Sequence, residues 1–287
     1  MTQPPPRRPQ ARSAHVVHVR QLTPRRRRVV LGVDDPADLR IGPYTDQYIR
    51  LLIAPRGMTY TQPFDLEHIK ATQPGELWPR LRSYTIRAWD PDSGEITVDF
   101  TMHGHNGLAT EWARRVEPGE IVHFMEPRGA YYPQPSADWH LLVGDESALS
   151  AVAAGVEALP KGARATVLLE VDDPLEEQRI DAPAGADIAW LHRGADRVGA
   201  RLLDAVHNLR LPSDGLQAFV HGEASFVREI RRHLLLDRDV PREDVSASGY
   251  WRLDHTDEHW RASKPAWNAQ IAAEEERLVE TALSPQR

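Results

Sequence analysis

Cysteine is absent from this chain of 287 residues. Its absence excludes disulfide scaffolds, thiol catalysis, thiolate-bound zinc and cysteine-bound iron–sulfur clusters. Long apolar runs are absent too, since no segment of the sequence approaches the ~20 apolar residues of a membrane-spanning helix. Any redox chemistry must therefore use a cofactor held without thiolates, in a protein that we expect to have no membrane partner.

The N-terminal segment 1–14 is rich in proline and arginine but has no apolar core of a secretory signal. We therefore expect a disordered tail and a cytoplasmic protein. The net charge of −7 argues against a nucleic-acid partner. The four consecutive arginines at 25–28 are expected to form a solvated strand edge or turn.

Several catalytic signatures are missing as well. Without a Gly-x-Ser-x-Gly elbow or a P-loop, hydrolase and nucleotide-triphosphatase functions have no sequence support. Histidine is plentiful, and two pairs, His103 with His105 and His255 with His259, invite a metal interpretation. Zinc sites of that kind need a third ligand, and the second pair stands in a polar, loop-like stretch. We therefore expect surface histidines and no metal site.

Two domains are expected from the length and from a change in pattern along the chain. In the first part, short apolar segments alternate with Pro and Gly, which is typical of a small antiparallel β-barrel. Its expected strands are 15–22, 28–32, 48–54, 82–89, 95–103 and 121–126, with one helix at 108–115. We assign residues 15–136 to this domain.

In the second part, buried apolar runs alternate with helical patterns, which predicts parallel βαβ units. The expected strands are 139–143, 166–171, 188–191, 216–220 and 245–251, and the expected helices are 146–159, 198–208 and 224–236. We assign residues 137–255 to this α/β domain. A charged amphipathic helix at 264–283, within an extension of residues 256–287, is expected to pack on a domain face rather than to close over a cleft.

The segment 82–87, Arg-Ser-Tyr-Thr-Ile-Arg, carries the chemistry of the first domain. Alternation along a strand puts Arg82 and Tyr84 on one face and Ser83 and Thr85 on the other. Such a strand can hold a flat ring and an anionic tail. Thr110 follows small residues at the start of the expected helix, where free N–H groups can bind a phosphate. Together these features suggest a bound dinucleotide such as a flavin.

The order of motifs resembles the siderophore-interacting protein family, a branch of the ferredoxin-reductase-like flavoproteins. The resemblance covers about residues 16–252. Its motifs are Arg-x-Tyr-Thr-x-Arg at 82–87, Gly-Leu-Ala-Thr-x-Trp-Ala at 107–113, Glu-Pro-Arg-Gly at 126–129, Gly-Asp-Glu-Ser-Ala-Leu at 144–149, His-Gly-Glu at 221–223 and Ser-Gly-Tyr-Trp-Arg at 248–252. Glu126 and Ser150 depart from the usual glycine and proline of this pattern.

The resemblance implies FAD in the barrel and NAD(P)H on the α/β domain. It implies flavin contacts from Arg82, Ser83, Tyr84, Thr85, Arg87, Asp99, Thr101, His103, Ala109 and Thr110. It implies further cofactor contacts from Asp145, Ser147, Gly222, Glu223 and Trp251. Asp145, Glu146 and Ser147 are equally consistent with capping the next helix, and Gly222 and Glu223 with a capped turn.

The choice between NADH and NADPH stays open at this point. A Gly-x-Gly-x-x-Gly fingerprint is missing, as in ferredoxin reductases. Asp172 and Asp173, after the second strand of the α/β domain, would repel a 2′-phosphate. Arg193, after the third strand, could receive one.

The function implied is reduction of ferric siderophores, which releases iron as iron(II). Ferric siderophores are often anionic, so Arg50 and Arg128 are expected to bind the substrate. Glu126 beside Arg128 speaks against that arginine as a free anion receptor. No catalytic acid or base is named, because electron transfer needs none.

Other readings of the sequence stay open. A generic flavin or quinone reductase and a non-catalytic siderophore- or flavin-binding protein are the alternatives. A ferredoxin-type protein is an alternative electron donor. We expect a monomer.

Overall fold

The computed structural model describes residues 11–102 and 107–283, with side chains described as far as Arg277. His103, one of the predicted flavin contacts, lies outside the described residues. The chain divides into two compact units, one ending at Ala130 and one beginning at Tyr131. The boundary expected after residue 136 lies a few residues later than this division, before the first strand of the second unit, which begins at Trp139.

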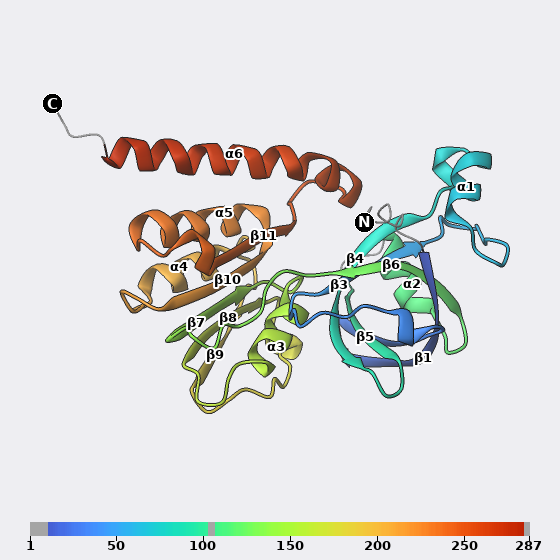
Figure 1. Ribbon diagram of the computed structural model, residues 1–287, viewed down its shortest axis with the longest axis horizontal. Coiled ribbons are helices and arrows are strands. Elements are labelled where there is room, and N and C mark those ends of the chain that lie inside the picture. Colours follow the sequence, from blue (N-terminus) through green and yellow to red (C-terminus); the bar gives the residue numbers. More distant parts are fainter. Residues whose placement is uncertain (1–10, 103–106, 284–287) are drawn as a thin grey trace, which may run out of the picture. The chain divides into compact units, whose positions relative to one another are not determined.

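The first unit is a closed antiparallel barrel with strand order β1-β2-β5-β4-β3-β6 (Figure 1). Its strands are β1 (Ala11–Thr23), β2 (Arg26–Val33), β3 (Tyr48–Ile53), β4 (Arg80–Asp90), β5 (Glu95–Thr101) and β6 (Ile121–Arg128). The predicted barrel is therefore confirmed. Strand β1 begins earlier than expected, because residues 11–14, expected in the tail, pair with β6 from Ala11 opposite Met125 onward.

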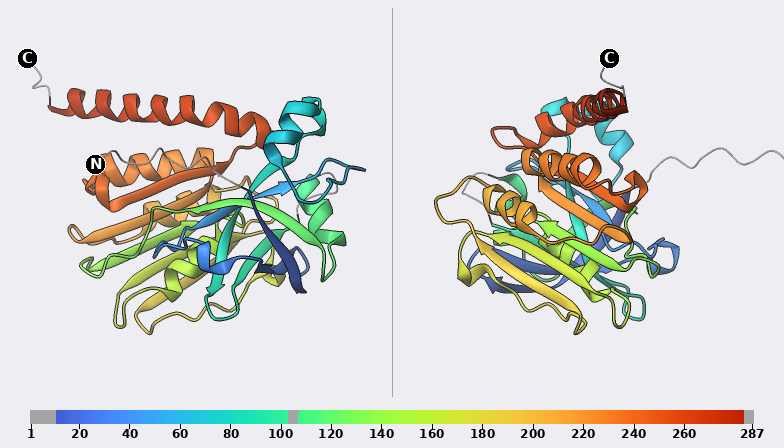
Figure 2. Two further views of the ribbon diagram at one scale, coloured as in Figure 1. Left: turned by 45° about the vertical axis from the view of Figure 1, so that its right-hand side comes forward. Right: turned by 90° about the vertical axis from the view of Figure 1, so that its left-hand side faces the viewer.

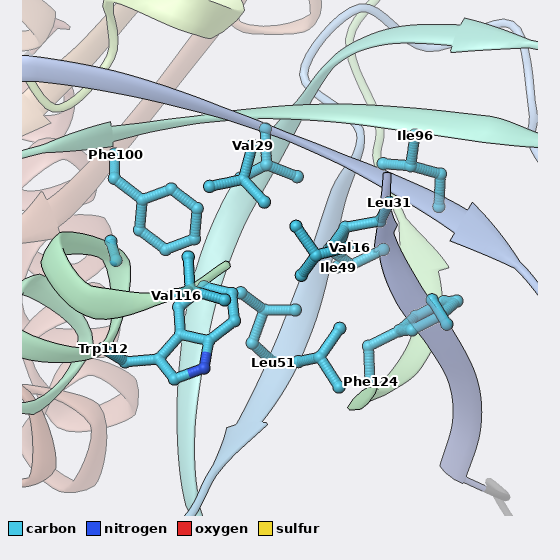
Figure 3. Packing of buried hydrophobic residues seen from close by; sticks show 14 of the residues in the cluster. Val16, Val29, Leu31, Ile49, Leu51, Ile96, Phe100, Trp112, Val116 and Phe124 are labelled. Carbon is cyan, nitrogen blue, oxygen red and sulfur yellow. The ribbon is translucent and has the colours of Figure 1, made fainter. Parts of the chain in front are cut away.

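The barrel is filled by alternate side chains of its strands and closed by one helix. Val29, Leu31, Ile49 and Leu51 are fully buried, as the apolar alternation of the strands requires. Helix α2 (Leu108–Arg115) has the predicted bounds, and its Trp112 packs into this core (Figure 3). The core therefore joins α2 to the barrel wall.

A helix that the sequence analysis missed, α1 (Leu66–Thr72), lies in the long connection between β3 and β4. Asp65 caps it by accepting the backbone N–H of His68 at 2.9 Å. The preceding residues are fixed to the barrel, since the Phe64 ring stacks on His123 of β6 with centroids 4.0 Å apart. This connection is therefore part of the first unit's packing.

The second unit is a parallel sheet of five strands in the order β11-β10-β7-β8-β9. The strands are β7 (Trp139–Gly144), β8 (Ala165–Val171), β9 (Ala186–His192), β10 (Leu216–Glu223) and β11 (Val245–Trp251). Helices α4 (Ala200–Asn208) and α5 (Ala224–Arg232) cover one face and α3 (Leu149–Glu157) covers the other (Figures 1 and 2). The α/β prediction is confirmed, although α3 starts after the expected residue 146.

The C-terminal helix α6 (Asp257–Leu283) starts before the expected residue 264. Trp260 is buried beneath β11 and donates its indole N–H to the carbonyl of Gly249 at 3.3 Å. Arg231 of α5 holds Glu275 through two hydrogen bonds of 2.5 and 3.0 Å. These contacts match the expected packing on a domain face. Among the described helices, none has the length and apolar character required to span a membrane.

Candidate functional site

The barrel has an open edge between β4 and β5. Residues Arg80 to Thr85 of β4 pair with β3, whereas the pairing of β4 with β5 begins only at Ile86. The last residues of β5, Asp99 to Thr101, pair with β2 on their other side. Within the described residues, no ladder joins 82–85 to 99–101. This stretch of β4 therefore borders β3 on one side and no strand of the described residues on the other, which makes it the candidate ligand-binding edge.

The predicted flavin residues of β4 lie along that edge with the expected alternation. Tyr84 is opposite Ile49 and Arg82 opposite Leu51, two core residues, so this face points inward. Ser83 and Thr85 take the outer face. A ligand lying along the edge can reach side chains of both faces. A ligand lying on one face could reach only the side chains of that face.

Three aromatic rings connect the parts of this region. The Tyr84 ring lies 4.2 Å from that of Phe100 in β5, and Phe100 lies 5.4 Å from Trp112 in α2. Figure 3 shows Phe100 and Trp112 side by side in the core. The structure thus brings together the β4 motif, the end of β5 and, through Trp112, helix α2. Arg87 lies apart from them, at the irregular step between Ile86 and Ala88.

The start of α2 is the candidate phosphate cradle. Gly107 stands at its N-cap position, and a Cβ there would lie 3.1 Å from the Thr110 hydroxyl. Ala109 and Thr110 are small and buried. Glu111 in the same turn is drawn to Arg56, 2.6 Å away, which offsets its negative charge. Backbone N–H groups at such a helix start can bind a phosphate at close range.

The run of arginines at 25–28 was expected to form a solvated strand edge or turn. Two of them, Arg26 and Arg28, instead make hydrogen bonds to the end of β5. Arg28 makes hydrogen bonds of 2.7 and 2.8 Å to the two carboxylate oxygens of Asp99. Arg26 is buried and donates to the Thr101 hydroxyl at 3.1 Å. The side chains of Asp99 and Thr101 thus face β2. The signal was present in the sequence, since alternate basic residues of one strand can pair with polar residues of a neighbour.

The expected substrate arginines share the outer face of the sheet formed by β4, β3 and β6. Arg50 is opposite Ser83 of β4, and Tyr48, two residues before it, is opposite Arg128 of β6. Arg50 is half-buried and Arg128 exposed. Glu126, which cast doubt on Arg128, accepts a hydrogen bond from Arg12 at 2.6 Å. Its charge is therefore offset by another residue.

In the second unit, Asp145 joins the carboxyl ends of three strands. Its buried carboxylate accepts hydrogen bonds from the backbone and hydroxyl of Ser147 at 2.8 and 2.5 Å. The other oxygen accepts the backbone N–H of Glu223 at 2.8 Å and the indole N–H of Trp251 at 2.9 Å. The sequence analysis considered a helix cap or a cofactor contact for Asp145. The N-cap of α3 is Ala148, and Asp145 instead fixes the turn before it.

Gly222 and Glu223 build the neighbouring turn. Gly222 has a φ of 144°, and a Cβ there would lie 2.6 Å from Phe226 and 2.7 Å from Asp145. Glu223 caps α5 by accepting the N–H of Ser225 at 2.7 Å, and it also accepts that of Leu253 at 3.2 Å. The carboxylates of Asp145 and Glu223 are thus hydrogen-bonded within the unit. Near them, backbone groups and the half-buried side chains of Ser147 and Trp251 are the candidates for contact with a ligand.

A second cluster surrounds Arg193 beyond β9. Its guanidinium lies 2.8 Å from Asp172, 3.4 Å from Glu146 and 3.6 Å from Glu170. Glu146 also accepts the backbone N–H of Asp172 at 2.7 Å. From the sequence, Asp172 is expected to repel a 2′-phosphate and Arg193 to receive one. The structure shows that they are partners.

Of the two histidine pairs, His103 with His105 lies outside the described residues. His255 and His259 stack with ring centroids 4.6 Å apart. Among the described residues, no group of three or more His, Asp or Glu side chains is placed to hold a metal ion.

Two family models match the chain in succession. The siderophore-interacting FAD-binding domain matches residues 15–131, and the siderophore-interacting protein model matches residues 137–254. An uncharacterized protein of Mycobacterium tuberculosis is 36% identical over 280 residues, covering 91% of this chain and 95% of that protein. The ferric vibriobactin reductase of Vibrio cholerae is 32% identical over 197 residues, covering 66% of this chain and 72% of the reductase.

Solved structures agree with this result. A siderophore utilization protein from T. fusca has a TM-score of 0.75 at 35% identity, covering 87% of this chain and 95% of that one. A ferredoxin reductase of carbazole 1,9a-dioxygenase has a TM-score of 0.62 at 17% identity, covering 86% of this chain and 71% of the reductase. The second likeness shows a shared fold alone.

Proposed function

From its membership of the siderophore-interacting protein family, to which this chain belongs, we propose that it is an FAD-dependent reductase of ferric siderophores with NAD(P)H as electron donor. The observation that carries the proposal is the open edge of β4 at residues 82–85, beside the rings of Tyr84 and Phe100. It lies in the domain that matches the FAD-binding model.

The residues at this edge fit FAD. A flat ring would have apolar contact from Tyr84, and the backbone and side-chain polar groups of residues 82–85 lie along the same edge. The cradle at Gly107 and Thr110 fits a pyrophosphate, because Gly107, Ala109 and Thr110 are small residues that permit close approach to the backbone. Arg82 is a charged partner for phosphate oxygens. FAD bound here would supply the redox chemistry, accepting a hydride and passing on electrons singly.

The chain's own contribution is binding, orientation and charge. In the α/β unit, the nicotinamide nucleotide is expected along the carboxyl ends of the parallel strands, as in other open α/β sheets. Asp145 and Glu223 keep the turns after β7 and β10 in place. They act as positioning residues rather than as acids or bases.

The substrate is an anionic chelate of iron(III), for which Arg50 and Arg128 supply positive charge on one face of the barrel. Oxygen ligands bind the small trivalent ion far more tightly than iron(II). Reduction therefore releases the cargo, and no proton needs to be moved by a side chain.

The test uses the full chain loaded with FAD under anaerobic conditions. Addition of NADH or NADPH should bleach the flavin absorbance, and a ferric tris-catecholate should then restore it while a ferrous-specific chelator traps iron(II). The gallium(III) chelate, which has the same charge and shape but cannot be reduced, is the matched control and should bind without restoring colour.

Other results would contradict the proposal. Equal or faster turnover with quinones or free flavin would make the protein a generic reductase. A chain that binds the gallium chelate but never bleaches with either nucleotide would be a binding protein.

A further inference from the structure

The environment of Arg193 decides how the α/β unit treats a 2′-phosphate. Only 13% of the Arg193 side chain is exposed, and its guanidinium faces Asp172, Glu146 and Glu170. Burial by itself lowers the pKa of Arg193, but the three carboxylates raise it by more, so the net shift is upward. The arginine is therefore charged and already engaged.

Three carboxylates face Arg193. Glu170 is fully buried, and desolvation raises its pKa against the opposing effect of Gly199 and Arg193. Two further carboxylates, Asp172 and Glu146, lie 2.8 and 3.4 Å from the same guanidinium. A phosphate dianion entering here would meet these carboxylates at close range and be repelled by them.

Asp172 also stands where a dinucleotide ribose is expected. It directly follows β8, which is the second strand of the unit along the chain and the neighbour of β7 in the sheet. In doubly wound folds an acidic residue at the end of the second strand accepts a hydrogen bond from the adenosine 2′-hydroxyl. Asp172 is the most exposed of the three carboxylates, with 21% of its side chain accessible.

We infer that this chain uses NADH rather than NADPH, with Asp172 as the residue that selects against the 2′-phosphate and Arg193 held by carboxylates instead of serving as a phosphate receptor. The inference rests on the proposed function, because it names the nucleotide of that reaction.

The first experiment needs no electron transfer. Binding of 5′-AMP and of adenosine 2′,5′-bisphosphate to the FAD-loaded chain is measured by titration calorimetry at low and high salt. We expect 5′-AMP to bind at least about tenfold more tightly at low salt, and the difference to shrink as salt screens the repulsion. Tighter binding of the bisphosphate would overturn the inference.

The second experiment changes the selecting charge. Asp172→Asn keeps the side-chain size, removes one negative charge and loosens the hold on Arg193. The ratio of kcat/KM for NADH to that for NADPH should fall by about tenfold or more. Asp214→Asn is the matched control, because Asp214 is exposed just before β10, at the amino ends of the strands. It should leave the ratio unchanged.

The outcomes separate the two proposals. If the flavin is reduced by both nucleotides equally or by NADPH preferentially, the inference is wrong and the reductase function stands. If neither nucleotide reduces bound flavin, the proposed function fails and this inference fails with it. A ratio that stays constant in Asp172→Asn would remove Asp172 as the selecting residue.

Discussion

Tyr84 and Phe100 hold their rings 4.2 Å apart across the stretch where β4 and β5 are not paired. Phe100 is fully buried, whereas Tyr84 is half-buried. One ring therefore belongs to the barrel core and the other forms the boundary between that core and the open edge. A flat ligand along the edge would use Tyr84 as its apolar wall.

Replacement of that wall tests the flavin site. Tyr84→Leu keeps apolar volume but loses the flat ring, so flavin should bind about fivefold more weakly, as expected for roughly 1 kcal/mol of aromatic contact. The unfolding free energy should fall by no more than about 1.5 kcal/mol. Flavin affinity is measured by fluorescence titration and stability by urea unfolding. Tyr44→Leu, at an exposed tyrosine of the same unit, should change neither. Unaltered flavin affinity in Tyr84→Leu would place the ring elsewhere.

Charge reversal at the two arginines of the outer face tests the proposed substrate site. Charge reversal, Arg50→Glu with Arg128→Glu, should raise KM for an anionic ferric tris-catecholate roughly tenfold at low salt while flavin content stays the same. An uncharged ferric hydroxamate should be affected far less. Arg20→Glu, an exposed arginine on β1, is the control and should leave KM unchanged. If the variant had the wild-type KM for both chelates, Arg50 and Arg128 would not belong to the substrate site.

Most of the fold could be predicted because its signals are local. Alternating apolar residues in the first half and buried runs separated by helical patterns in the second predicted each strand. The bounds of α2 and β11 were predicted to the residue. Helix α1 was missed because its seven residues lie in a polar connection and bury only Ile69. The early start of α6 was missed because the burial of Trp260 is a tertiary contact, which the local sequence pattern does not reveal.

The candidate site was predictable as a set of positions but not as a set of contacts. Sequence alone could place Asp99 on a strand near the flavin motif, but not opposite Arg28, which depends on the β2–β5 register. Likewise, the sequence could name Asp145 as a cofactor contact but could not show that its oxygens accept four hydrogen bonds within the unit. Pairings between residues far apart in sequence decide which polar groups stay available to a ligand.

Gly222 gives a test of the turn after β10. Gly222→Ala would combine an unfavourable φ of 144° with contacts of 2.6 Å to Phe226 and 2.7 Å to Asp145. We expect the unfolding free energy of the α/β unit to fall by about 3 kcal/mol or more. Gly162→Ala is the matched control, since Gly162 also has a positive φ, 85°, but nothing within 4 Å of a Cβ. It should cost about 1 kcal/mol. Equal losses in urea unfolding would mean that only the backbone angle matters.

His221 makes the stability of the α/β unit depend on pH. The ring is buried, stacks on Phe219 at 3.8 Å and is 3.0 Å from the Ser246 hydroxyl. Burial, assisted by the charge of Lys264, lowers the pKa of His221 from 6.5 to about 3. Lys264 itself lies 2.9 Å from Ser248. The folded protein thus keeps His221 neutral at pH values where the unfolded chain is protonated.

The sign of the effect follows from this difference. Stability is fully present above about pH 6.5 and is lost as pH falls toward about 3, at up to about 1.4 kcal/mol per pH unit for this one proton. His140 of the same unit, whose pKa desolvation also lowers, adds to the same trend. Urea unfolding of the wild type and of His221→Asn between pH 7.5 and 4.5 measures the slope. The variant should be less stable at pH 7.5 but have a shallower slope, by about one proton. Parallel slopes would show that His221 does not couple folding to pH.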